Sequence, residues 1–408
     1  MSLGHQTTDT GRMQKSLDRK LAAIHADPHG CREFIIADAK DADMAFGIGA
    51  PGRSPERHDG EARYKTLAEF REQIRQIVRQ ELVDIMLMSA STSEVLTLQE
   101  RIFDDSPITP AIRANDTSDI HAFRGSRIPE APSHPFRTAS LDHVQCGYLD
   151  CAPEERGRGV NLGLYSMTFN NDCELDLATL EAYGRFRDEA ERKGFRHFLE
   201  VFNPNLPGAV SPEMLPFFIN DVIARTLAGV TSTSRPIFLK IPYPGPKALE
   251  ELVAYDPHLV VGILGGSSGT TRDAFQLIHD AQKHGGRIAL FGRKINNAEN
   301  QLAFIEFLRH IVEGVIAPDE AVRAYHAVLE KLGLAPHRPL EEDLMVTTGV
   351  MSYAGSPPPG SGQPTDSQHP SEAPRSRQER PNVAAMTPDQ RLAYHQDRLR
   401  RMFDGDSA

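Results

Sequence analysis

The chain has 408 residues, enough for one large domain with appendages, and its formal net charge of −11 argues against a general nucleic-acid-binding surface. No apolar run approaches the length of a membrane span, and the polar N-terminus lacks the apolar core of a signal peptide. The four cysteines are few and irregularly spaced, which is typical of a reducing cytoplasm. We therefore expect a cytoplasmic protein without membrane or nucleic-acid partners.

Apolar runs and helical patterns alternate through most of the chain. A helix is predicted over residues 13–26, ahead of the first strand. The strands are predicted from continuous apolar runs, which are typical of parallel strands buried on both faces. These runs span residues 33–38, 83–89, 108–113, 161–168, 197–202, 237–240, 259–264 and 288–291. Helical patterns follow several of them, over residues 67–82, 175–193, 212–227, 273–284 and 300–313.

Eight strands with intervening helices predict an α/β protein, a (β/α)8 or TIM barrel over residues 31–350. An N-terminal extension with a helix, residues 1–30, precedes it. A doubly wound open sheet is the alternative, and the count of eight strands favours the barrel. The segment 116–159 is long for a barrel loop, and we expect it to cover part of the active-site mouth.

The C-terminal part has a different composition. Residues 355–385 are rich in Pro, Ser, Gly and Gln, which predicts a disordered linker. An amphipathic helix is predicted over residues 386–404, with Thr387 as its N-cap and Gln390 completing a capping box. We interpret this helix as a docking element that packs on its own barrel or on a neighbouring subunit of a homo-oligomer. A separate partner-binding peptide is the alternative.

Two cysteines raise the question of a metal site. Cys146 and Cys151 follow His143 closely, so the three side chains could bind zinc. Their spacing is not that of a standard zinc knuckle. We expect a protein that needs neither a metal nor another cofactor.

The most informative residue is Lys240, which ends a short apolar strand. Burial lowers the pKa of a lysine and makes its amine a nucleophile toward carbonyls. Glu200 holds an interior-type position on the preceding strand, and adjacent strands lie about 4.8 Å apart. This pair suits imine formation with proton transfer by the carboxylic acid. A buried ion pair that merely fills the top of the barrel is the alternative.

Glycine-rich turns follow the last two strands. Gly265, Gly266 and Ser267 come after the seventh strand, and Gly292 and Arg293 after the eighth. Glycines let the backbone approach an anion, and a following helix presents its positive end. We expect these turns to bind the phosphate of a small-molecule substrate; tight turns without a ligand are the alternative.

Two other strand ends carry charged candidates. Asp38, at the end of the first strand, could orient the lysine or act as a general base, although Asp41 and Asp43 compete for that role. Arg113, on the third strand, is a candidate anion contact, and a structural salt bridge is an equal alternative.

Several segments resemble the class I, Schiff-base aldolases of the bacterial and archaeal fructose-bisphosphate and tagatose-bisphosphate type. Phe238-Leu-Lys-Ile-Pro-Tyr-Pro-Gly245 is similar to the segment around their imine-forming lysine. Gly265-Gly-Ser-Ser-Gly and Gly292-Arg-Lys-Ile resemble their phosphate-binding turns. The resemblance covers roughly residues 32–314. The sequence also departs from the family. Asp38-Ala-Lys replaces the usual strand-one motif, Asn161 stands where the tagatose branch tends to have a lysine on strand four, and Asn203 is the nearest match to the catalytic tyrosine of the archaeal branch after strand five.

The resemblance implies a metal-independent carbon–carbon lyase with Lys240 as the imine-forming residue, Glu200 as its proton-transfer partner and Asp38 as the strand-one acid. The substrate would be a phosphorylated sugar or a related keto compound. Two other functions stay open from the residues. One is a phosphate-binding barrel isomerase with Glu200 as its base, and the other is a diverged, non-catalytic metabolite-binding barrel.

Overall fold

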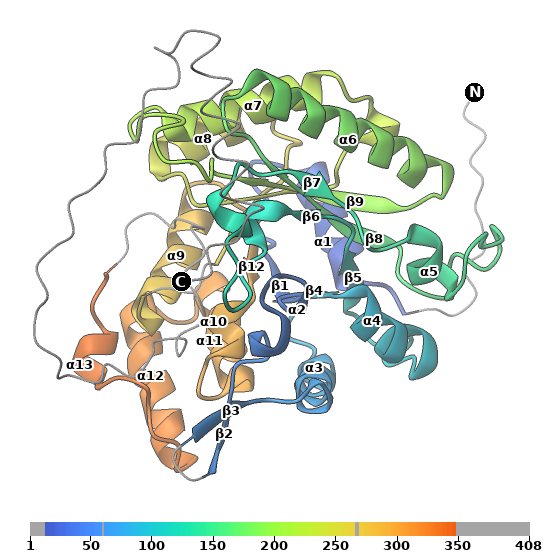
Figure 1. Ribbon diagram of the computed structural model, residues 1–408. Helices are drawn as coiled ribbons and strands as arrows, with labels where there is room; N and C mark the ends of the chain where they lie inside the picture. The colour runs from blue at the N-terminus through green and yellow to red at the C-terminus, as the bar shows by residue number, and fades with distance from the viewer. Residues whose placement is uncertain (1–12, 59–60, 266–268, 348–408) are drawn as a thin grey trace, which may run out of the picture. The chain divides into compact units, whose positions relative to one another are not determined.

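Eight parallel strands close into a barrel (Figure 1). The computed structural model describes residues 13–58, 61–265 and 269–347. Strand β1 pairs in parallel with both β4 and β12, which closes the ring. In order around the ring, the strands are β1 (Ile35–Lys40), β4 (Ile85–Met88), β5 (Thr109–Arg113), β8 (Leu162–Thr168), β9 (Arg196–Phe202), β10 (Leu239–Ile241), β11 (Val261–Leu264) and β12 (Ile288–Phe291). The predicted (β/α)8 barrel is confirmed, and the open-sheet alternative is wrong.

Helices cover the outside of the strands (Figure 1). The longer helices of the described chain, including those not on the outside of the barrel, are α1 (Ser16–Ala26), α3 (Leu67–Gln80), α6 (Cys173–Arg192), α7 (Leu215–Ala228), α8 (Pro246–Tyr255), α9 (Thr271–Lys283), α11 (Gln301–Val312) and α12 (Pro318–Lys331). Most lie within a few residues of their predicted bounds. Helix α8, between β10 and β11, was not among the predicted helices and is only ten residues long.

The connections between these elements contain short helices and strands. They are α2 (Asp43–Phe46), η1 (Gly47–Gly49), β2 (Arg53–His58), β3 (Glu61–Tyr64), α4 (Ala90–Ser93), η2 (Glu94–Gln99), β6 (Asp116–Thr117), η3 (Ser118–Ile120), η4 (Ile128–Glu130), β7 (Pro135–Phe136), α5 (Leu141–Cys146), η5 (Ser232–Ser234), α10 (Arg293–Asn296) and α13 (Leu340–Asp343). The predicted linker and C-terminal helix lie outside the described residues. No helix in the described part of the chain is long and apolar enough to cross a membrane.

Barrel side chains form two apolar layers, because successive residues of a strand point to opposite faces. The inner layer fills the barrel and includes Phe198 and Phe238, whose stacked rings have centroids 4.4 Å apart. The outer layer packs between strands and helices and includes Met86 and Phe291. This division decides which polar side chains reach the interior.

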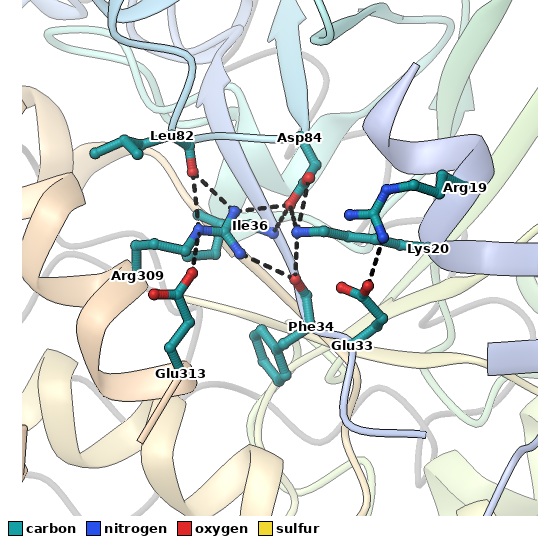
Figure 2. A network of polar contacts seen from close by, with 9 residues as sticks. All are labelled: Arg19, Lys20, Glu33, Phe34, Ile36, Leu82, Asp84, Arg309 and Glu313. Carbon is teal, nitrogen blue, oxygen red and sulfur yellow. Dashed lines mark hydrogen bonds and ion pairs between the residues drawn. The ribbon is translucent and has the colours of Figure 1, made fainter. Parts of the chain in front are cut away.

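Helix α1 closes the amino end of the barrel by adding its apolar face to the inner layer. A buried ion network holds it there (Figure 2). Lys20 of α1 and Arg309 of α11 both lie 2.9 Å from the carboxylate of Asp84, which also accepts a hydrogen bond from the backbone N–H of Ile36. Lys20 donates in addition to the carbonyl oxygen of Phe34. The network joins both helices to the segments that carry β1 and β4.

The carboxyl end of the barrel is covered by its own connections. Phe46, from the segment after β1, packs in one apolar cluster with Ile120 of the long insertion. The same cluster contains Phe202 and Leu264, at the carboxyl ends of β9 and β11. The two connections therefore meet over the end of the barrel where TIM-barrel proteins carry their functional groups.

Candidate active site

Strand register brings several polar side chains together inside the barrel. Lys240 on β10 lies opposite Glu200 on β9, and Glu200 lies opposite Ser166 on β8. Residues in register on parallel strands point to the same side of the sheet. Because Phe198 and Phe238 belong to the inner layer, Glu200 and Lys240, two residues further along their strands, also point inward.

Lys240 and Glu200 form the close pair that the sequence predicts. The lysine Nζ lies 2.6 Å from Glu200 Oε1, and both side chains are buried. The other carboxylate oxygen of Glu200 accepts a 2.6 Å hydrogen bond from the hydroxyl of Ser166. An amine and a carboxylic group in contact, shielded from water, are arranged for proton transfer between them.

Arg113 on β5 links this pair to a second carboxylate. Its Nε donates to Asp41 Oδ2 over 2.6 Å, and its two terminal nitrogens donate to Ser166 and Glu200 over 2.9 Å and 3.4 Å. Burial alone would raise the pKa of Asp41, but the positive charges of Arg113 and Lys240 outweigh it and hold that pKa below its usual value. Arg113 therefore forms the salt bridges expected as the alternative, and its contact with a substrate anion stays a prediction.

Asp38 lies on the wrong face for the role expected of it. It stands opposite Met86 and Phe291, two members of the outer layer. Its carboxylate forms a fully buried ion pair with Lys40, 3.2 Å away, and burial raises its pKa to about 6. Strand β1 continues to Lys40, which shares the outer face with Asp38. The next residue, Asp41, is the acid that lines the cavity.

A small cavity of about 50 Å³ opens at this cluster, with room for a few water molecules. It is lined by Ala39, Asp41, Ala42, Ala45, Phe46, Arg113, Lys240, Leu264, Gly265, Leu290, Gly292 and Arg293. Phe46 is one of the lining residues, and the guanidinium carbon of Arg293 lies 5.3 Å from the centre of its ring.

The predicted phosphate turns are represented in the cavity by Gly265, Gly292 and Arg293, whereas Gly266 and Ser267 lie outside the described residues. Packing explains two of the glycines without a ligand. A Cβ at Gly265 would lie 2.1 Å from the ring of Phe291, and one at Gly292 would lie 2.6 Å from a backbone oxygen of β1. Arg293 supplies the charge that these turns add to the cavity.

Ser166 is a site residue that the sequence analysis missed. We compared Asn161 with the lysine on strand four of the tagatose branch, but Asn161 precedes β8 at its amino end and accepts a hydrogen bond from Gln145. Ser166 is the residue of β8 in register with Glu200. Leu162 and Leu164 belong to the inner layer, and Ser166 lies two residues further along the same strand. The alternation of strand faces could therefore have placed Ser166 inside the barrel from the sequence.

The described residues contain no group of three or more His, Cys, Asp or Glu side chains that could hold a metal ion. Near the proposed zinc ligands, the thiol of Cys146 donates to the backbone oxygen of Tyr148. The site is therefore built from a lysine, an arginine, two carboxylates and a serine at the carboxyl end of a closed parallel barrel.

Comparison with known proteins places this barrel beside aldolases. An archaeal fructose 1,6-bisphosphate aldolase aligns with a TM-score of 0.51 and 14% identity, over 72% of this chain and 99% of its own. The fructose-bisphosphate aldolase from Slackia heliotrinireducens DSM 20476 aligns with a TM-score of 0.54 and 15% identity, over 76% of this chain and 91% of its own. No protein-family profile matches the sequence, and no curated protein is similar to it. At these identities, the similarity shows a shared fold.

Proposed function

We propose that the protein is a class I, metal-independent aldolase that acts on a phosphorylated sugar or a related keto compound. The observation that supports this most is the contact between Lys240 and Glu200 at the edge of a cavity in an aldolase-like barrel. A buried amine beside a carboxylic group is the combination that imine chemistry requires.

Imine formation would involve Lys240 and Glu200 in successive steps. Lys240, once its proton has moved to Glu200, adds through its lone pair to the substrate carbonyl and gives a carbinolamine. Glu200 then returns a proton to the carbinolamine hydroxyl, which leaves as water while the C=N bond forms. The 2.6 Å contact between Nζ and Oε1 serves the first transfer, and the same carboxyl group then supplies the proton of the second.

Carbon–carbon cleavage would need a second base. As the bond breaks, its electrons move into the protonated imine and give an enamine, and the hydroxyl on the departing fragment loses its proton. We assign that proton to Asp41, because the charges of Arg113 and Lys240 favour its ionised form and it lines the same cavity. Arg293, with the turns after β11 and β12, would hold the phosphate.

Borohydride trapping tests the proposal. Dihydroxyacetone phosphate followed by borohydride should leave a stable mass adduct on Lys240, located by peptide mass spectrometry. Lys240→Arg keeps a positive charge near Glu200 but should give no adduct, because a guanidinium does not form the imine. Absence of an adduct on Lys240 with any compound of this type refutes the aldolase assignment. Substantial turnover by Lys240→Arg would favour the isomerase alternative.

A further inference from the structure

We propose that Lys40, which the mechanism does not use, positions the anion-binding arm of the site. This arm comprises Gly292, Arg293 and the short helix α10 that they begin. The inference rests on the proposed function, because it assigns this arm to the phosphate of the substrate. Lys40 acts through other residues and does not touch the cavity.

Lys40 joins three elements through one ammonium group. Its Nζ donates to Asn296 Oδ1 at the end of α10 and, over 2.9 Å, to Gln301 Oε1 at the start of α11. The same nitrogen lies 3.2 Å from Asp38 on its own strand. Asn296 comes three residues after Arg293, so the amine holds the far end of the helix that carries the arginine.

Other contacts hold α10 from different directions. Lys294 Nζ donates over 2.7 Å to the backbone oxygen of Gly269, in the turn after β11. Gly52, at a φ of +83°, packs so closely that a Cβ there would lie 3.1 Å from Asn297 Oδ1. Helix α10 and the residue after it are therefore contacted by Lys40, by the turn after β11 and by the segment around Gly52. The direction of Arg293 is therefore set by these contacts as well as by the strand that precedes it.

The buried charges and unpaired polar groups around Lys40 cost folding free energy, so stability alone does not explain them. Lys40 and Asp38 are fully buried, and Asn296 Nδ2 and Gln301 Nε2 are buried without a hydrogen-bond partner among the described residues. Apolar side chains of similar volume often replace a buried ion pair without loss of stability. What they do not provide is a directional contact to both helices, and that contact is what places the arm.

The chain offers a matched control in Lys20. It is also a buried lysine on a carboxylate, 2.9 Å from Asp84, but it belongs to the network at the amino end of the barrel. Lys20→Met and Lys40→Met therefore remove the same group from comparable surroundings. Only the second change removes a contact to α10.

Binding of inorganic phosphate, followed by the phosphorus NMR signal or by calorimetry, tests the inference. Lys40→Met should raise the dissociation constant at least about tenfold, since a charged group displaced by about 1 Å loses much of its binding contribution. Lys20→Met should leave it within about twofold of the wild type. Asn296→Ala, which keeps the Asp38–Lys40 pair, should weaken binding in the same direction and serves as the second variant where Lys40→Met does not fold.

Three outcomes overturn the inference. They are an unchanged dissociation constant in both α10-linked variants, an equal loss in Lys20→Met, and no phosphate binding by the wild-type protein. None of them depends on imine formation. Trapping on Lys240 together with unchanged phosphate binding would retain the aldolase proposal and reject the role of Lys40, so the two failures are distinguishable.

Discussion

Replacing Arg113 by methionine tests the charge arrangement of the site most directly. The side chain is 4% exposed and contacts Asp41, Ser166 and Glu200. Its removal leaves two buried carboxylates with Lys240 as their remaining cation in the cluster. Removing one partner of a buried ion pair typically costs about 3–5 kcal/mol. We expect a loss of unfolding free energy of this size near neutral pH.

The loss should depend on pH. In the wild type the pKa of Asp41 is held below its usual value, so the group contributes stability above the unfolded pKa of about 4 and loses it as pH falls through the lower, folded value. Without Arg113, burial is opposed by Lys240 and a backbone hydrogen bond, and the pKa of Asp41 rises. The variant then takes up a proton on folding as the pH falls. The difference in unfolding free energy between wild type and variant should therefore become smaller as the pH falls from about 7 to about 5.

Urea unfolding followed by circular dichroism at these two pH values measures both effects. Arg127→Met is the control, because its ion pair with Glu130 is exposed and should contribute little. Equal midpoints for Arg113→Met and the wild type at neutral pH would contradict the proposed coupling. A large loss that is the same at both pH values would show that packing, rather than charge, makes Arg113 necessary.

Two further changes test the site and its packing. Asp41→Asn should lower kcat in an aldol-cleavage assay by at least about 10²-fold, as expected for a general base, and Asp38→Asn should lower it far less because Asp38 lies on the outer face. The opposite order would restore Asp38 as the strand-one acid. Gly265→Ala should cost about 1–3 kcal/mol of stability in thermal unfolding, because the new Cβ meets the ring of Phe291. A variant as stable as the wild type would mean that this turn can shift.

The barrel was predictable because its strands are buried on both faces and read as continuous apolar runs. The first strand shows where this signal fails. A charged residue was taken as its end, but β1 includes both Asp38 and Lys40, which neutralise each other in the outer layer. Lys40 also donates hydrogen bonds to Asn296 and Gln301, more than 250 positions away in the sequence, and no local pattern marks these contacts.

The site was predictable to the extent that alternation within one strand decides it. Lys240 and Glu200 follow phenylalanines of the inner layer, so their shared face is readable from the chain. The contact between Arg113 and Asp41 is different, because it depends on how the connection after β1 turns over the barrel. From the sequence, Asp38, Asp41 and Asp43 were all candidates for the acid at the end of the first strand. In the structure, β1 extends to Lys40, and Asp41 is the one of the three that lines the cavity.

Arg113 gives the site a property that the Lys240–Glu200 pair lacks alone. In the proposed mechanism, Lys240 becomes neutral as its proton moves to Glu200, which removes a positive charge from near Asp41. A guanidinium does not lose its proton under these conditions. Because Arg113 contacts both Asp41 and Glu200, it would keep a positive charge beside them throughout the proposed reaction. Ser166 completes the link by accepting from Arg113 and donating to Glu200. Under the proposed aldolase mechanism, Arg113 would balance the charge of these carboxylates while Lys240 forms the imine.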